Sequence, residues 1–183
     1  MKKIRKIFLF LIVTSFLVMA IYYLKSPIES RLAEINKPKQ TYFPDQVDQE
    51  LWDSIGDSYL QDSTTKNLDP RVAKMKIFLE KKFEIEDFSL YRAGDREDHG
   101  KGLAIDLMTY RDKDKGDEIA QYLVKNFDNM GLSYIIWQQK FYMDVRNRYG
   151  PADLWNPMED RGSITANHYD HVHISFKNYE NKS

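Results

Sequence analysis

The sequence predicts an α+β domain, a small antiparallel sheet with flanking helices, that follows one N-terminal transmembrane helix. The first observation behind this prediction is an apolar run over residues 7–24. The second is the alternation of helix-like and strand-like patterns over residues 45–180, where short connections favour antiparallel pairing of strands. The third is composition: 42% of the 183 residues are hydrophobic and 30% are charged, which excludes a disordered, collagenous or wholly membrane-embedded chain.

Charge and cysteine content narrow the classes of function. The chain has 27 basic and 28 acidic residues, so its net charge of −1 gives no basic field of the kind that binds nucleic acid. Five of the basic residues and none of the acidic ones lie in residues 1–25, which leaves 22 basic and 28 acidic residues, a net charge of −6, for the rest. The absence of cysteine excludes disulfides, a thiolate nucleophile and cysteine-based metal sites.

The N-terminal apolar run is long enough to cross a bilayer. A helix over residues 7–24 would be about 27 Å long at ~1.5 Å per residue, close to the thickness of the hydrocarbon core. The basic residues before it should stay in the cytoplasm, which places the rest of the chain outside. We expect residues 1–25 to be an uncleaved signal-anchor; a cleaved signal peptide is the alternative, because Val18-Met19-Ala20 has the spacing of a cleavage site. Residues 26–44 are polar and carry three prolines, which predicts a stalk.

Two helices are expected next. Apolar residues recur every four positions over residues 45–60, which suggests a short amphipathic helix. The residues of this stripe are Val47, Leu51, Ile55 and Tyr59. Asp69 is the predicted N-cap of a second helix, and Pro70 is its predicted first residue. The inward face of that helix should consist of Val72, Met75, Leu79 and Phe83.

The remaining elements are strands around one further helix. Strands are expected at residues 88–92, 103–110, 132–138, 140–144 and 172–176. The helix should follow a turn at residues 112–116, with Gly131 as the residue after its end. Its apolar face would consist of Ile119, Tyr122, Leu123, Phe127 and Met130. Polar loops over residues 94–102 and 149–167 complete the predicted domain, which covers residues 45–183.

All four histidines of the chain fall into two short motifs. His99 begins the segment His-Gly-Lys-Gly-Leu-Ala-Ile-Asp, and the other three lie within Asn-His-Tyr-Asp-His-Val-His, residues 167–173. Histidines with separate structural roles would not be expected to gather in this way. Because the chain has no cysteine, a metal site here would need histidine and carboxylate ligands, and catalytic zinc takes three protein ligands.

Strand periodicity indicates how these side chains meet. Asp106 lies in mid-strand on the face opposite to the leucines and isoleucine, where a carboxylate is costly to bury without a cationic partner. In the last strand, His171, His173 and Ser175 share one face. If the two strands pair, Asp106 and His173 meet on the open face, and a zinc ion would balance the carboxylate charge. A salt bridge to a lysine or arginine is the alternative for Asp106.

These motifs resemble a known family of zinc enzymes. The pattern consists of His99-x-x-Gly102-x-Ala104-x-Asp106, followed about 70 residues later by Asp170-x-x-His173. It resembles the zinc D-Ala-D-Ala carboxypeptidases of the VanY type, within the wider group that joins lysostaphin-type enzymes, D-Ala-D-Ala peptidases and the hedgehog fold. The resemblance covers about residues 70–178.

The resemblance implies a role for each matching residue. It makes His99, Asp106 and His173 the zinc ligands and Asp170 the general base. Arg92, which precedes the first ligand, matches the arginine that steadies the substrate carbonyl or the oxyanion.

Two positions depart from the family pattern, and a third residue offers an alternative. Glu97 stands where the family often has a serine that orients substrate, and the base is usually glutamate, one methylene longer than Asp170. Strict strand alternation would also point Asp170 away from His173. His171 is the alternative base, because the lysostaphin-like branch uses the first histidine of His-x-His; otherwise it is expected to stabilise the oxyanion or to support a ligand.

We therefore expect a membrane-anchored, extracytoplasmic zinc metallopeptidase that hydrolyses peptide bonds in peptidoglycan stem peptides. D-Ala-D-Ala carboxypeptidase and related endopeptidase activity both remain open. A non-catalytic, zinc-stabilised module that binds peptidoglycan is the alternative function. The expected partners are stem peptides and, through the N-terminal helix, the membrane. A metal-dependent nuclease is disfavoured, because the exported part is acidic and nucleic acid is a polyanion.

Overall fold

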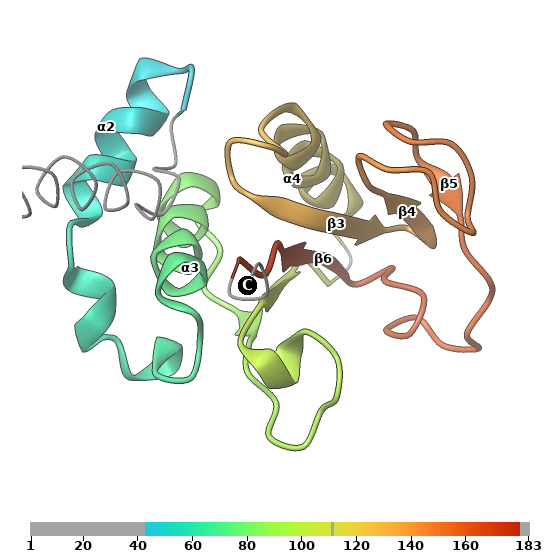
Figure 1. The fold of residues 1–183 in the computed structure, drawn as a ribbon, viewed down its shortest axis with the longest axis horizontal. Coiled ribbons are helices and arrows are strands. Elements are labelled where there is room, and N and C mark those ends of the chain that lie inside the picture. Colours follow the sequence, from blue (N-terminus) through green and yellow to red (C-terminus); the bar gives the residue numbers. More distant parts are fainter. Residues whose placement is uncertain (1–42, 111, 180–183) are drawn as a thin grey trace, which may run out of the picture. The chain divides into compact units, whose positions relative to one another are not determined.

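The computed structural model describes residues 43–110 and 112–179, which are built around a six-stranded antiparallel sheet (Figure 1). The strands are β1 (Phe88–Ser89), β2 (Ala104–Met108), β3 (Leu132–Trp137), β4 (Lys140–Tyr142), β5 (Asn156–Pro157) and β6 (His171–Phe176). Their order in the sheet is β1-β2-β6-β3-β4-β5, so the last strand lies between β2 and β3. The predicted α+β class and the antiparallel pairing are confirmed.

Three α-helices accompany the sheet in the described part of the chain. They are α2 (Gln46–Ile55), α3 (Pro70–Phe83) and α4 (Lys113–Lys125), and short 3-10 helices η1 (Ser58–Gln61), η2 (Ser63–Thr65) and η3 (His99–Lys101) lie in the connections. The side chains of Asp45, Asp69 and Asp112 each accept hydrogen bonds from backbone N–H groups in the first turn of a helix, which satisfies donors that the helix leaves unpaired. The predicted start of α3 at Asp69 and Pro70 is confirmed.

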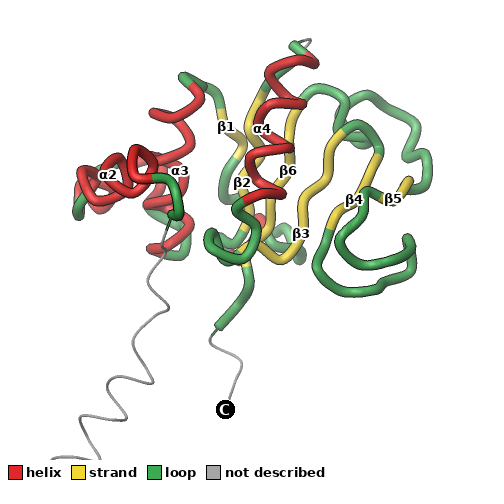
Figure 2. The backbone as a smooth tube through the Cα atoms, turned by 90° about the horizontal axis from the view of Figure 1, so that it is seen from above, coloured by secondary structure: helices red, strands yellow, loops and turns green. Residues whose placement is uncertain are grey.

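The two faces of the central strands differ sharply in chemistry. Ile105 and Leu107 of β2 and Val172 and Ile174 of β6 are fully buried and form one core with α3 and α4. Figure 2 shows α4 lying over the sheet. From α3 and α4, the fully buried contributors to this core are Val72, Met75, Phe78, Leu79, Ile119 and Leu123. The alternate residues of β2 and β6, including Asp106, point to the opposite face, which leaves that face for polar chemistry.

The helix α2 presents a different face from the predicted one. Val47 is 72% exposed, whereas Asp48, Trp52 and Ile55 are buried. A helix has 3.6 residues per turn, so a stripe that repeats every four residues moves gradually around its surface. Asp48, Trp52 and Ile55, which are spaced by four and then three residues, stay closer to one face. The predicted place of Val47 on the inward stripe is therefore wrong, but Ile55 of that stripe is buried and Leu51 packs partly buried against the core.

Several boundaries also differ from the predicted ones. The strand expected over residues 88–92 is reduced to Phe88–Ser89, and the expected turn at 112–116 is the first turn of α4. The helix ends at Lys125 rather than just before Gly131, because residues 126–130 form turns. Phe127 and Met130 in these turns are still buried, so the apolar pattern continues past the end of the helix. The tight connection predicted between β3 and β4 is confirmed, with Gln138 and Gln139 both at positive φ.

The described ranges contain no helix that is long and apolar enough to cross a membrane. The predicted signal-anchor, residues 1–25, and all but the last two residues of the predicted stalk lie outside these ranges.

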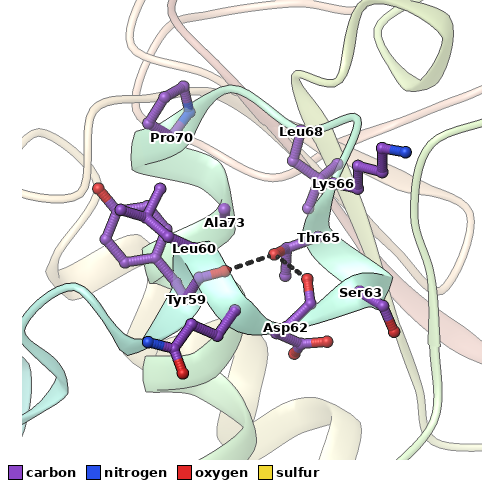
Figure 3. A pocket seen from close by; sticks show the side chains of 10 residues that line it. Tyr59, Leu60, Asp62, Ser63, Thr65, Lys66, Leu68, Pro70 and Ala73 are labelled. Carbon is purple, nitrogen blue, oxygen red and sulfur yellow. Dashed lines mark hydrogen bonds between the residues drawn. The ribbon is translucent and has the colours of Figure 1, made fainter.

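A separate hollow of about 390 Å³ lies where η1 and η2 meet the start of α3 (Figure 3). The Thr65 hydroxyl oxygen lies 2.8 Å from the carbonyl oxygen of Tyr59 and 2.9 Å from that of Asp62, which fixes the short turns around it. The hollow shares no residue with the pocket that contains the histidines.

Candidate metal centre

The pairing of β2 with β6 brings Asp106 directly opposite His173. His99 reaches the same place from η3. His173 Nδ1 lies 2.7 Å from Asp106 Oδ1, His99 Nε2 lies 3.1 Å from the same oxygen, and the two nitrogens are 3.3 Å apart. All three residues are buried, and their ligand atoms could hold a metal ion. The predicted meeting of Asp106 and His173 on the face away from the core is therefore confirmed.

Two glycines allow the His99 segment to fold tightly. Gly102 ends η3 at a φ of 69°, and a Cβ atom there would lie 2.3 Å from the carbonyl oxygen of Asn67. A Cβ atom at Gly100 would lie 1.8 Å from the carbonyl oxygen of Asp95. The Gly102 carbonyl also accepts a hydrogen bond of 3.0 Å from the backbone N–H of Asp69, which ties the loop to the start of α3.

The hydrogen bonding of His99 leaves a lone pair aimed at the cluster. His99 Nδ1 lies 2.6 Å from the backbone carbonyl oxygen of Leu90, and a carbonyl oxygen can only accept, so Nδ1 carries the proton. In the neutral ring, Nε2 then faces Asp106 Oδ1 without a proton between them. Nitrogen and oxygen lone pairs at this separation repel each other unless a cation lies among them. The arrangement therefore favours a bound cation.

The donor set and spacing fit zinc. Zinc–nitrogen and zinc–oxygen bonds of ~2.0–2.1 Å in a tetrahedron place the ligand atoms about 3.3 Å apart. The two distances that involve His99 Nε2 are 3.1 and 3.3 Å, and the remaining one is 2.7 Å, so only a small outward movement of His173 or Asp106 is needed. Two imidazoles and one carboxylate also form one of the ligand sets that zinc uses in enzymes.

Arg92 binds the second oxygen of the Asp106 carboxylate. Its guanidinium donates to Asp106 Oδ2, while Asp106 Oδ1 faces the two histidines. Burial works to raise the pKa of Asp106, but without a metal ion His173 and His99, when protonated toward the carboxylate, outweigh it and hold the pKa well below its ordinary value. A cation bound among the three residues would replace those protons and lower the pKa in the same direction. The carboxylate is thus ionised and available as a ligand. The Arg92 side chain is 47% exposed and lines the pocket, so part of it also faces the space where a substrate would lie.

Asp170 and His171 form a hydrogen-bonded pair beside the cluster. Asp170 Oδ1 lies 2.7 Å from His171 Nδ1, and its other oxygen accepts a 2.6 Å hydrogen bond from the Thr165 hydroxyl. Burial works to raise the pKa of Asp170, but the hydrogen bonds from Thr165 and His171 lower it overall. His171 Nε2 lies 3.7 Å from Asp106 Oδ1. His171 therefore faces the cluster, and Asp170 supports it from behind.

The fourth histidine belongs to the same group of rings. The His168 ring centroid lies 4.6 Å from that of His171 and 5.5 Å from that of His173. Burial, together with the two neighbouring histidines, lowers the pKa of His168 to about 3, so its ring is neutral at physiological pH. His168 has a positive φ of 57°, which turns the chain just before β6.

A pocket of about 490 Å³ opens over these side chains. Its lining includes Arg92, Glu97 and all four histidines, but not Asp170. The sequence did not single out Tyr134, Ile136, Phe141, Arg161 and Thr165, which also line it. Tyr134 and Ile136 are alternate residues of β3, so their periodicity is a usable signal only once β3 is known to lie beside β6.

Comparisons with known proteins find a family and one partial relative. Residues 64–169, more than half of the chain, match the family model described as VldE, C-terminal domain. The matched range includes His99 and Asp106 and ends before His171. A protein of Arthroderma benhamiae, named an uncharacterized secreted protein, is 37% identical over 64 residues, which are 34% of this chain. The match spans only 26% of the length of that relative. No solved structure matches the chain.

Proposed function

The chain belongs to the VldE C-terminal domain family, and from the side chains that this member gathers we propose a zinc-dependent peptidase acting on peptidoglycan stem peptides outside the cytoplasm. The observation that carries the proposal is the convergence of three ligand atoms, from His99, Asp106 and His173, in one pocket with His171, whose ring is hydrogen-bonded to Asp170 from outside the pocket lining. Metallopeptidases need both parts, a three-ligand metal site and an adjacent group that moves protons.

The ligands would be His99 Nε2, Asp106 Oδ1 and His173 Nδ1, which is the number of protein ligands that a catalytic zinc takes. Zinc bound there would lower the pKa of the attacking water to about 7 and polarise the scissile carbonyl. Arg92 holds the Asp106 carboxylate in place through its second oxygen, and its exposed part can donate to the substrate carbonyl or the developing oxyanion.

For the general base, the contacts favour His171 over Asp170. Both carboxylate oxygens of Asp170 are engaged, one by His171 and one by Thr165. The protonated Nδ1 of His171 donates a hydrogen bond to Asp170. Its Nε2 is therefore free to accept a proton from the attacking water and later to pass it to the leaving amine. Asp170 then fixes the tautomer and orientation of His171, as the aspartate does in a catalytic triad. The sequence favoured the reverse assignment, and the test below separates the two roles.

Three features support peptidoglycan peptides as the substrate. The motifs resemble VanY-type D-Ala-D-Ala carboxypeptidases in order and spacing. The predicted N-terminal anchor would place the domain on the outer side of the membrane. The pocket contains guanidinium groups from Arg92 and Arg161 and carboxylates from Asp95 and Glu97, which suits a peptide that carries both carboxylate and ammonium groups. Terminal trimming and internal cleavage are both compatible with this lining.

Hydrolysis of purified muropeptides tests the proposal. The zinc-loaded full chain should cleave stem peptides, as measured by mass spectrometry of the products. We expect His171→Ala to lower the rate by about 10²–10⁴-fold with its zinc content retained, and Asp170→Asn to lower it less, because His171 remains. A larger loss in Asp170→Asn than in His171→Ala would return the base role to Asp170. If the zinc-loaded wild type leaves every stem peptide intact, the peptidase proposal fails and the non-catalytic binding module, which the glutamate at position 97 favours, takes its place.

A further inference from the structure

A chain of side-chain hydrogen bonds leads outward from His173, on the side away from the cluster. His173 Nε2 lies 3.2 Å from the hydroxyl oxygen of Ser175. The Ser175 hydroxyl in turn donates a 2.8 Å hydrogen bond to Asp98 Oδ2, and the Tyr134 hydroxyl donates to the same oxygen at 2.9 Å. Ser175 is fully buried, and Asp98 immediately precedes His99.

The direction of each hydrogen bond in this chain follows from the carboxylate. An ionised carboxylate only accepts, so the single hydrogen of the Ser175 hydroxyl must point to Asp98. Toward His173, the Ser175 oxygen can then only accept, which requires a proton on His173 Nε2. In the neutral ring this leaves Nδ1 with a lone pair, and Nδ1 is the atom that lies 2.7 Å from Asp106 Oδ1.

We propose that Asp98, acting through Ser175, is a positioning residue that holds His173 in the tautomer whose Nδ1 is presented to the metal. Histidine ligands commonly donate their second ring N–H to an outer partner, which fixes the ring and strengthens it as a ligand. His99 meets the same requirement with a backbone carbonyl, that of Leu90. For His173 the requirement is met by side chains, so it can be tested by substitution.

Further contacts restrict the movement of this chain of hydrogen bonds. The Tyr134 ring stacks on the His173 ring, with centroids 5.4 Å apart and an interplanar angle of 23°. The Asp98 backbone carbonyl accepts hydrogen bonds from Lys101 at 3.2 Å and Leu103 at 2.8 Å, which close the turn that carries His99. Asp98 therefore joins the two histidine ligands: its backbone shapes the η3 turn, and its side chain orients the ring on β6.

Zinc affinity of the full chain, measured by competition with a chromophoric chelator, tests this inference. Loss of such an outer partner typically weakens metal binding by about 10–100-fold, so we expect losses in this range for Ser175→Ala and Asp98→Asn. Tyr134→Phe should weaken binding less, because its ring still stacks on His173 and Ser175 still reaches Asp98. The matched control is Ser133→Ala on β3, whose hydroxyl hydrogen-bonds no described residue, and its affinity should equal that of the wild type.

A long-range ¹H–¹⁵N correlation spectrum of the zinc-loaded full chain gives a second readout, which a merely structural role would not move. We expect the spectrum to show a proton on His173 Nε2 that exchanges slowly with solvent. In Ser175→Ala the same proton should exchange fast. Zinc bound through Nε2 of His173, or wild-type affinity in both Ser175→Ala and Asp98→Asn, would overturn the inference. The inference rests on the metal site of the proposed function but not on catalysis. If Ser175→Ala and Asp98→Asn weaken zinc binding as expected but the wild type hydrolyses no muropeptide, the role of Asp98 is supported and only the peptidase proposal is refuted.

Discussion

Replacement of Gly102 by alanine should destabilise the domain strongly, because this glycine combines an unusual backbone conformation with a close backbone contact. Its φ of 69° is left-handed, which costs a residue with a Cβ atom about 1–2 kcal/mol. The new Cβ atom would also lie 2.3 Å from the carbonyl oxygen of Asn67 and 2.9 Å from the Cα atom of Leu68. Relief of this overlap requires movement of backbone, and overpacking of this kind costs about 1–3 kcal/mol. Together these effects predict a loss of about 2–5 kcal/mol in the free energy of unfolding.

Gly94→Ala separates the two contributions. Gly94 also has a left-handed φ, 85°, but no atom lies within 4 Å of a Cβ atom built there. Its replacement should therefore cost only the conformational part, about 1–2 kcal/mol. Urea unfolding of a chain of residues 41–183, whose described part forms one compact unit, measures both variants. A chelator is present, so that metal binding does not contribute. Equal losses for Gly102→Ala and Gly94→Ala would refute the contact between the His99 turn and the segment before α3.

Two further substitutions test other parts of the structure. Gly116→Ala should destabilise the domain by about 1–3 kcal/mol and alter tryptophan fluorescence. The new Cβ atom would lie 2.1 Å from the ring of Trp137, which is 4% exposed. Unchanged stability and fluorescence would contradict this packing. Asp62→Asn tests a carboxylate with a lowered pKa. Burial works to raise the pKa of Asp62, but hydrogen bonds from Thr64 and the positive charge of Lys76 outweigh it. The variant should be less stable than the wild type at pH 7, and the difference should narrow as the pH falls below about 4; equal stability at pH 7 would contradict the assignment.

Local rules predicted much of the fold from particular residues. Asp69 followed by Pro70 predicted the start of α3, because the aspartate side chain and the missing proline N–H both suit a helix start. The inward positions of Val72 and Leu79 followed from helical spacing. The error at Val47 has the same origin: a repeat of four residues does not fix the buried face of a short helix to within one position, and only packing against α3 decides it.

The candidate site could be predicted in part. Alternation within strands placed Asp106 and His173 on one face, and the pairing of β2 with β6 makes them direct neighbours. What periodicity could not supply is the identity of the other neighbours. Tyr134 enters the site because β6 lies between β2 and β3, an order that depends on long-range packing. The Asp170–His171 hydrogen bond likewise depends on a local turn before β6 that strict strand alternation does not describe.

Zinc content tests the central claim most directly, since the proposed function and the role of Asp98 both need a metal at His99, Asp106 and His173. We predict about one zinc ion per full-length chain, measured by native mass spectrometry together with elemental analysis. The ion should be lost in His99→Ala and in His173→Ala. It should be retained in His168→Ala, a matched loss of a buried histidine that supplies none of the three converging ligand atoms. Equal zinc in the wild type and in all three variants, or none in the wild type, would contradict the account.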